Sequence, residues 1–389
     1  MPELIESGLC TGCMACEQKC KAGAIGIEQD SLGNLHPVID KNRCVNCGAC
    51  EQACPQLQPV PYYEAKKAYA VWSQNDETRK KSASGGAASE FYLYGIRHGY
   101  WICGTEYDQQ YRVVHTVAKE QARIDRYRQS KYVYSEFREV YSQIRTHLEQ
   151  GERVICISLP CKIAGLLKYL GRKYENLITV DIVCHGTPPY KNLWEHIQAV
   201  AGTHEKAKLI FREDNIFCFN MKEQNKTIVK KIGRTDAYLA AFLEGLNYRE
   251  SCYRCSYARP ERVSDITICD FWGLGQDLPF DHPYNGSISA VLIHTEEGNA
   301  FFEQVKPQLF VEERPVWEAI KGNTQLNMPS KPHEKRKEFE QLYQRVGFED
   351  AVKICLKQEM KAEAKHVFRC KLKSRLRKLA GIVVKRYRG

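Results

Sequence analysis

The chain has 389 residues, of which 43% are hydrophobic and 27% are charged, with eighteen cysteines and a formal net charge of +10. This length leaves room for two or three domains. The first residues have neither the basic start nor the apolar core of a signal peptide, and no stretch approaches the roughly twenty apolar residues of a membrane-spanning helix. We therefore expect a cytoplasmic protein, whose reduced cysteines serve metal or redox chemistry rather than disulfides.

Eight of the cysteines lie in two copies of one pattern near the N-terminus. They are Cys10, Cys13, Cys16 and Cys20 in CTGCMACEQKC, and Cys44, Cys47, Cys50 and Cys54 in CVNCGACEQAC. The spacing is that of bacterial ferredoxins, in which the fourth cysteine of each run ligates the other cluster. It predicts two [4Fe–4S] clusters, one held by Cys10, Cys13, Cys16 and Cys54, the other by Cys44, Cys47, Cys50 and Cys20.

These runs predict a ferredoxin lobe over residues 1–58. Two zinc knuckles or a disulfide-stapled lobe are the alternatives, but zinc sites pair two C-x2-C units rather than placing three cysteines at consecutive steps of three. Pro55 follows Cys54 as the ferredoxin pattern requires, whereas Lys21 follows Cys20. The segments between the runs predict a strand, a turn and a second strand, with the sequences AIGI, DSLGN and LHPVID.

A linker and a glycine-containing turn come next. We assign residues 59–68 to an extended linker because the segment PQLQPVPYYEAKK is rich in proline. A strand at YAVWS and a helix within SASGGAASEFYLYGIRHG follow, the helix with Ser84 as its N-cap. Gly85 and Gly86 would let the backbone approach a ligand, and the free N–H groups of such a helix start favour phosphate. A simple Gly-Gly turn is the alternative.

A strand–helix–strand unit is predicted over residues 153–183. Its parts are a buried strand at Arg153–Ser158, a turn at Pro160 and Cys161, a helix at Ile163–Leu170 closed near Gly171, and a second buried strand at Leu177–Val183. The crossover should be right-handed, which makes the strands parallel. Cys161 and Cys184 then leave the sheet at the same carboxyl edge, where open α/β sheets bind ligands. Two unrelated buried thiols are the alternative.

Cys252 and Cys255 form a C-x2-C pair, which is a common half of a metal site. Together with Cys161 and Cys184 they would supply four thiolates for a third [4Fe–4S] cluster; a zinc site that includes His185 is the alternative. Asp270 follows the strand ITIC and would lie at its end. The aromatic residues after it could stack on a flat cofactor or belong to the core.

The C-terminal third is expected to be mostly helical from about Ala300. Residues 361–389 contain eleven Lys and Arg residues and one acid, so this tail alone equals the net charge of the chain. Its apolar residues follow one helical face, at Phe368, Leu372, Leu376, Leu379 and Val383. Such a helix could lie on an anionic membrane surface or dock on its own domain. No recognition motif accompanies the charge, so no nucleic-acid partner is expected.

Several segments, taken together and in order, resemble the coenzyme F420 hydrogenase/dehydrogenase beta-subunit family, in its bacterial form with an N-terminal two-cluster ferredoxin domain. They are SASGG (82–86), SKYVYS (130–135), LPCKIAGL (159–166), VDIVCHGTPP (180–189), CYRC (252–255) and SDITICDFWG (264–273). The resemblance covers residues 1–345 and implies a flavin and iron–sulfur domain over 69–345. Residues 346–389 would form a helical C-terminus with the basic tail.

The fold class that follows is a multidomain α+β or α/β chain: a ferredoxin lobe, a mixed-sheet domain with helices, and a helical C-terminal region. The resemblance implies FAD beside a [4Fe–4S] cluster in the large domain. It carries the cluster role onto Cys161, Cys184, Cys252 and Cys255, and the flavin role onto Ser84, Gly85, Gly86, Lys131 and Asp270. It fixes the redox groups better than the substrate.

We therefore expect an iron–sulfur flavoprotein oxidoreductase that exchanges electrons with reduced ferredoxin or a similar carrier and acts on a substrate that the sequence does not identify. In such enzymes the protein positions and tunes the cofactors. His185 is a candidate proton donor because its unperturbed pKa is close to neutrality, although such a histidine can equally serve a sulfur hydrogen bond. The alternatives are an electron-transfer adaptor that docks on a partner enzyme and a membrane-associated relay that uses the tail.

Overall fold

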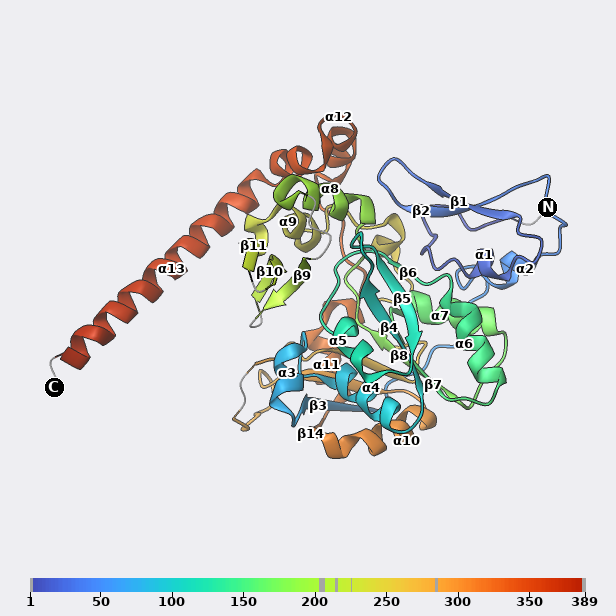
Figure 1. Cartoon of the computed structure of the whole chain (residues 1–389), viewed down its shortest axis with the longest axis horizontal. Coiled ribbons are helices and arrows are strands. Elements are labelled where there is room, and N and C mark those ends of the chain that lie inside the picture. Colours follow the sequence, from blue (N-terminus) through green and yellow to red (C-terminus); the bar gives the residue numbers. More distant parts are fainter. Residues whose placement is uncertain (1–2, 203–206, 214–215, 225, 284–285, 387–389) are drawn as a thin grey trace. The chain divides into compact units, whose positions relative to one another are not determined.

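The structure is a computed structural model of the chain (Figure 1). It describes residues 3–202, 207–213, 216–224, 226–283 and 286–386, and the side chains of these residues up to 373 except that of residue 371. The chain divides into two compact units. The first comprises Met1–Lys191 and Tyr248–Lys331, and the second Asn192–Asn247 and Pro332–Gly389. The sequence-based domain ranges stay a prediction.

The N-terminal part of the first unit has the two-fold pattern of a ferredoxin-like lobe. Strands β1 (Ile25–Gln29) and β2 (Leu35–Ile39) pair antiparallel, which confirms the predicted strand, turn and strand. Helices α1 (Ala15–Lys19) and α2 (Ala49–Gln52) each begin within a cysteine run. Both N-caps adopt the left-handed conformation, at Met14 and at Gly48, so each run bends sharply before its helix.

A nine-stranded mixed sheet forms the rest of the first unit, in the order β14-β3-β13-β12-β8-β7-β4-β5-β6. The strands are β3 (Lys67–Ser73), β4 (Trp101–Tyr107), β5 (Val113–Ala118), β6 (Ser135–Glu136), β7 (Val154–Ser158), β8 (Leu177–Ile182), β12 (Ile266–Asp270), β13 (Ser289–Ile293) and β14 (Leu309–Arg314). Strands β12, β8, β7 and β4 are mutually parallel. The predicted parallel pairing of the two buried strands is confirmed, as is the mixed α/β fold class.

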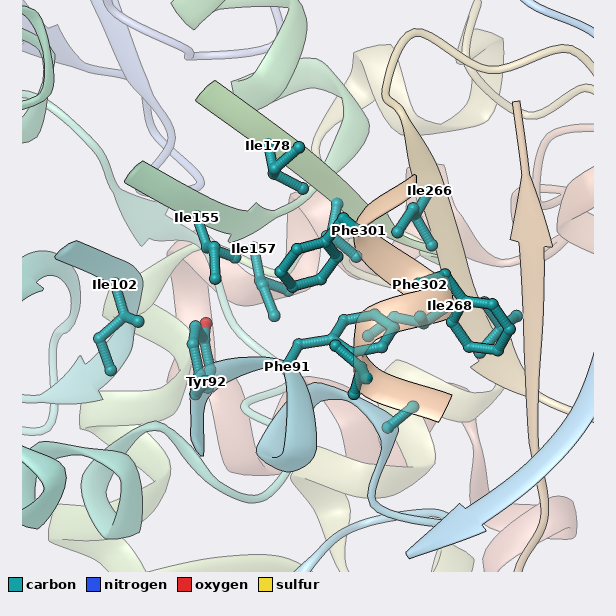
Figure 2. Close-up of a cluster of buried hydrophobic side chains, with 14 of the residues drawn as sticks. Phe91, Tyr92, Ile102, Ile155, Ile157, Ile178, Ile266, Ile268, Phe301 and Phe302 are labelled. Carbon is teal, nitrogen blue, oxygen red and sulfur yellow. The ribbon is translucent and has the colours of Figure 1, made fainter. Parts of the chain in front are cut away.

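Side chains alternate between the two faces of this sheet, as the period of two in a β-strand requires. On one face Ile155 and Ile157 join a core with Phe91 of α4 (Ala87–Arg97) and with Phe301 and Phe302 of α10 (Glu296–Val305), as Figure 2 shows. The other face packs against helices whose bounds are α6 (Val140–Glu149), α7 (Pro160–Leu170) and α11 (Val316–Gly322). The shorter helices of this unit are α3 (Asp76–Lys81) and α5 (Ile124–Tyr127).

Two predicted helix starts are wrong. Helix α7 begins at Pro160, so Pro160 and Cys161 form its first turn rather than a separate loop. Proline is favoured at this position because the first N–H of a helix needs no partner there. Helix α4 begins at Ala87 with Gly86 as N-cap, not Ser84. The Ser84 hydroxyl instead donates to the carbonyl oxygen of Ile288 at 3.3 Å, which fixes it to the neighbouring strand.

The second unit has a smaller antiparallel sheet and several helices. Its strands, in the order β11-β10-β9, are β9 (Lys208–Glu213), β10 (Ile216–Glu223) and β11 (Lys226–Ile232). Its helices are α8 (Tyr190–Ala201), which starts in the first unit, α9 (Ala237–Leu243), α12 (Arg336–Cys355) and α13 (Lys357–Arg386). The C-terminal third is therefore helical as predicted, apart from the strand β14, which pairs with β3.

Helix α13 carries the basic tail. Near its start Glu363 lies beside Gly233 and pairs with Arg234 at 3.9 Å, so this end of the helix docks within the second unit. Further along, Phe368 and Leu372 are 67% and 47% exposed. The side chains of Leu376, Leu379 and Val383 lie outside the described residues. Of the helices described, none has the combination of length and apolar composition needed to cross a membrane.

A fully buried histidine in the second unit lies between two acids. The Nε2 atom of His196 is 3.0 Å from Oδ2 of Asp236, and its Nδ1 atom pairs with Glu349. Burial acts to lower the pKa of His196, but the two carboxylates outweigh it and raise that pKa from 6.5 to about 9. The histidine is therefore held as a cation in the folded protein.

This arrangement predicts a pH-dependent stability. Because the folded pKa lies above the unfolded value, the stabilisation is complete below about pH 6.5 and is lost as the pH rises through about 9. A shift of this size corresponds to about 3 kcal/mol. Denaturant unfolding between pH 6 and 10 should show this fall, and His196→Gln should abolish it. The exposed His366→Gln is the matched control and should keep it; a flat profile in the native chain would contradict the prediction.

Candidate functional site

The fold brings the fourth cysteine of the second run to the first three cysteines of the first run. These four, which we call the first cysteine group, are Cys10, Cys13, Cys16 and Cys54. All are buried, and they line one cavity of about 370 Å³ that is partly open to solvent. This is the crossed set that the ferredoxin spacing predicts. Ligation itself stays a prediction, since the arrangement concerns the cysteines alone.

The second cysteine group consists of the other four N-terminal cysteines, Cys20, Cys44, Cys47 and Cys50. Cys50 is buried, Cys20 and Cys44 are half-buried and Cys47 is exposed. Burial raises the pKa of Cys50, and the nearby Cys20 adds to the effect. Val45, between two members of the group, is 69% exposed. The second group therefore lies at the protein surface, in contrast to the buried first group.

The third cysteine group consists of the four scattered cysteines, Cys161, Cys184, Cys252 and Cys255. They line one cavity of about 550 Å³ that is partly open to solvent, together with His185. Cys161 lies in the first turn of α7, directly after β7, and Cys184 follows β8. These two strands are parallel, so their carboxyl ends meet at one edge of the sheet. Cys252 and Cys255 come from a short helical turn at Glu250–Arg254 and the residue after it.

The donor chemistry of the third group fits an iron–sulfur cluster. Burial raises the pKa of Cys161 to about 12, with further contributions from Cys255 and Cys252, and burial likewise raises the pKa of Cys255 to about 11. Four thiolates that repel one another in such a cavity are unstable without a cation. Soft thiolates select iron–sulfur clusters or zinc, and both assignments are compatible with the four sulfurs. All eighteen cysteines are free, so no disulfide occupies any of the three groups.

The first and third groups are neighbours. Thr11 lines both cavities, and Tyr257 lies close to Cys13 and to Cys161. Helix α7 makes this possible through Gly165. A Cβ at Gly165 would lie 3.2 Å from Sγ of Cys13 and 2.6 Å from the hydroxyl oxygen of Tyr141, so only glycine admits the first cysteine loop at this distance. The same helix carries Cys161, and it therefore links the two groups.

Comparison with known proteins agrees with this arrangement. Residues 151–318 match the family model that describes the C-terminal part of the beta subunit of coenzyme F420 hydrogenase/dehydrogenase. Two models of a 4Fe-4S dicluster domain match residues 9–57 and 36–105. By residues 151–318, the chain belongs to the coenzyme F420 hydrogenase/dehydrogenase beta-subunit family. The N-terminal residues form a 4Fe–4S dicluster domain, which confirms the resemblance predicted from the sequence.

One similar solved structure is described as a xenon derivatization of the F420-reducing [NiFe] hydrogenase complex from Methanosarcina barkeri. It shares 17% identity with this chain, with a TM-score of 0.45, over 67% of this chain and 90% of that one. No curated protein matches the chain.

The residues that the family resemblance assigns to flavin lie at two places. Gly85 packs against the protein's own strands, because a Cβ there would lie 2.4 Å from the carbonyl oxygen of Val71 and 2.7 Å from the amide nitrogen of Ser289. Ser84 accepts a hydrogen bond from the Ser289 hydroxyl at 3.1 Å. Asp270 lies opposite Ser289 in the register of β12 and β13. The Ser84–Gly86 turn and Asp270 are thus brought to one region of the sheet.

Lys131 lies on a different loop, which flanks the same turn. Its ammonium donates to the carbonyl oxygens of residues 127–129, the closest being that of Arg128 at 3.1 Å. The neighbouring Gln129 donates to the carbonyl oxygen of Lys81 at 2.8 Å, and Arg128 donates to the Ser89 hydroxyl at 3.3 Å. Lys131 therefore shapes the loop beside the start of α4. Its flavin role stays a prediction.

His185 lies between the third cysteine group and the Asp270 region. It lines the cavity of the third group, and its backbone carbonyl accepts a hydrogen bond from the Ser330 hydroxyl at 2.5 Å. Burial lowers the pKa of His185, and the charge of Asp270 offsets part of this effect. The histidine is therefore favoured in its neutral form. Its role as a proton donor stays a prediction.

Three residues of the site carried no functional prediction from the sequence. Lys162 and Arg249 are buried beside the first group, and Tyr257 is buried beside the first and third groups. A lysine within the apolar run PCKIAGLL was a readable signal, because a charge at a core-facing helix position needs an explanation. Nothing in the local sequence singled out Arg249 or Tyr257, since their positions depend on contacts with residues more than two hundred positions away.

Proposed function

We propose that the chain is an iron–sulfur flavoprotein oxidoreductase that carries electrons through three [4Fe–4S] clusters and FAD, and works with reduced ferredoxin or a similar one-electron carrier. The observation that carries this proposal is the adjacency of the first and third cysteine groups inside one compact unit. Membership in a family of hydrogenase/dehydrogenase subunits supports the reaction class. The substrate and the direction of electron flow are not part of the proposal.

The cysteine groups would hold the clusters, four thiolates to each. When bound, the clusters would exchange single electrons, and the flavin would join these single electrons to two-electron chemistry at the substrate. The different burial of the groups supports an order of use. The exposed Cys47 and Val45 make the second group accessible to an external carrier, whereas the first group is buried beside the third. Tyr257 and Gly165 keep the first and third groups close together.

A flavin near the Ser84–Gly86 turn is supported by two features. Helix α4 starts at this turn without a side chain that caps its N–H groups, and such a helix end favours a phosphate group. Asp270 and His185 lie on the same edge of the sheet as the third cysteine group, so a flavin ring held there would be close to it. His185 would supply or remove a proton at its imidazole, and Asp270 would influence the charge of that imidazole.

Anaerobic purification followed by iron, sulfide, zinc and flavin analysis tests the proposal. Three clusters correspond to about twelve irons and about twelve sulfides per chain, with one flavin. Full iron content without any flavin would instead favour an electron-transfer adaptor that docks on a partner enzyme. About eight irons with zinc would assign the third group to a zinc site, and the absence of iron would refute the proposal.

We also propose that the basic tail contacts an anionic surface such as a membrane. Two large apolar side chains of α13, those of Phe368 and Leu372, are exposed among basic residues, an arrangement that suits the headgroup region of a bilayer. Deleting residues 361–389 should abolish co-sedimentation with vesicles that contain anionic lipid, and neutral vesicles should not bind the full chain. Equal sedimentation of the full and truncated chains would refute this proposal.

A further inference from the structure

Two cations lie buried beside the first cysteine group. The side chain of Lys162 is 1% exposed and that of Arg249 is 2% exposed. Among the residues that the structure describes, neither forms an ion pair with a carboxylate. The first unit pairs its other strongly buried arginines with acids, Arg262 with Asp181 at 2.8 Å and Arg314 with Glu318 at 2.7 Å. Lys162 and Arg249 therefore stand apart from the way this unit treats buried positive charge.

Both cations hold the loop of the first cysteine run through its carbonyl groups. The Nζ atom of Lys162 donates to the carbonyl oxygen of Gly12 at 2.6 Å and lies 4.3 Å from the centre of the Tyr134 ring. The Nε atom of Arg249 donates to the carbonyl oxygen of Cys10 at 2.6 Å. Gly12 has a φ of +66°, and a Cβ there would lie 3.0 Å from Nη1 of Arg249, so the loop is fitted closely to these charges.

Carbonyl dipoles and an aromatic face compensate a buried cation only in part, and a buried charge is stable when an opposite charge lies close to it. The first cysteine group supplies the missing charge. The positive charges of Lys162 and Arg249 act on Cys13 and Cys10 respectively. Burial acts to raise the pKa of Cys10, but a hydrogen bond with His36 and the charge of Arg249 outweigh it and lower that pKa. The surroundings therefore favour negative charge at this group.

The second cysteine group has a different electrostatic setting. The cations that flank it in the sequence, Lys21 and Arg43, are exposed, so solvent and salt screen their charges. A charge in the low dielectric of the interior acts far more strongly than the same charge at the surface. Four thiolates leave a bound cluster with net negative charge, and reduction adds one more negative charge. Buried cations therefore favour reduction of a cluster in the first group over one in the second.

We propose that Lys162 and Arg249 are positioning residues that set the order of reduction: their fixed charges make the first cysteine group the preferred resting place of an electron, relative to the second group. The inference rests on the proposed function, because it requires clusters at both groups. It assigns a direction to the electron within the ferredoxin lobe, from the exposed second group towards the buried first group and so towards the third.

The test is a redox titration followed by electron paramagnetic resonance on anaerobically purified variants, with iron analysis of each. Lys162→Met and Lys162→Gln remove the charge, Lys162→Arg retains it, and Lys21→Met removes an exposed charge beside the second group. The signal of the first group is identified by its loss in Cys16→Ser. We expect Lys162→Met and Lys162→Gln to lower the ratio of reduced to oxidised cluster at a fixed potential by about tenfold, equal to about 59 mV for one electron.

Lys162→Arg should restore the potential, and Lys21→Met should leave the first signal unchanged. An unshifted first signal with full iron content in Lys162→Met would overturn the inference while leaving the proposed function intact. Loss of the first group's iron in both neutral variants, with retention in Lys162→Arg, would support the charge as the requirement for holding the cluster. Loss in Lys162→Arg as well would show a role of shape and would overturn the inference. A native chain without [4Fe–4S] clusters would refute the proposed function itself.

Discussion

Replacing Cys252 with serine is expected to lower the iron content of the anaerobically purified chain from about twelve to about eight atoms, the content of two four-iron clusters. The third cysteine group would then retain three thiolates and one poor ligand in its cavity. Its three remaining sulfurs lie among groups that burial already makes costly to ionise, so a weakened cluster would be lost rather than held.

The ferredoxin lobe should be unaffected, because Cys252 belongs to a different cavity from the first cysteine group. Iron and sulfide analysis, with the visible and paramagnetic spectra, measures the loss. Cys269→Ser is the matched control: Cys269 lies on β12 in the same sheet, does not line the cavity of the third group, and should leave all iron in place. Equal iron content in the native chain and in Cys252→Ser would exclude the third cluster.

The elements around the third group were readable from the sequence because their signals are local. The buried apolar runs of β7 and β8 and the helix between them predicted a parallel pair, and this alone brings Cys161 and Cys184 to one edge. The predicted helix start was wrong because Pro160 was expected to break the helix, whereas it occupies the first position, where proline is accepted. The spacing of the two cysteine runs likewise predicted which four cysteines would gather around the first cavity.

The contact between the lobe and the large sheet was not readable. It depends on Gly165, whose missing side chain admits Cys13, and on Arg249, which reaches the carbonyl of Cys10 across 239 positions of the chain. Such contacts follow from the packing of finished elements, and neither residue differs in local pattern from an ordinary helix glycine or surface arginine. The Ser84 N-cap failed for the same reason, since a neighbouring strand supplied the hydroxyl with another partner.

A buried ion pair supports the wall of the third cavity. Asp181 of β8 is fully buried and accepts hydrogen bonds from Arg262 at 2.8 Å, from Ser264 at 2.6 Å and from Thr267 at 2.9 Å. Arg262 in turn lines the cavity and donates to the carbonyl oxygen of Tyr257 at 2.5 Å. The carboxylate of Asp181 therefore fixes the arginine that holds Tyr257 in place.

Replacing Asp181 with asparagine is expected to lower the free energy of unfolding by about 3–5 kcal/mol, because it leaves the Arg262 guanidinium buried without a counter-charge. The asparagine amide would also present a donor where the carboxylate accepted hydrogen bonds. Denaturant unfolding monitored by far-ultraviolet circular dichroism measures the change. We also expect iron in the third group to fall, since Arg262 and Tyr257 line its cavity.

Two controls separate the buried charge from other effects. Glu261→Gln breaks the exposed pair between Glu261 and Arg259 in the same segment and should change stability by less than about 1 kcal/mol. The double variant Asp181→Leu with Arg262→Met removes both charges and should recover much of the stability lost in the single variant, because an apolar pair of similar volume leaves no charge buried alone. If the double variant were as unstable as Asp181→Asn, the hydrogen bonds to Ser264 and Thr267 would dominate, and the uncompensated charge would not be the cause.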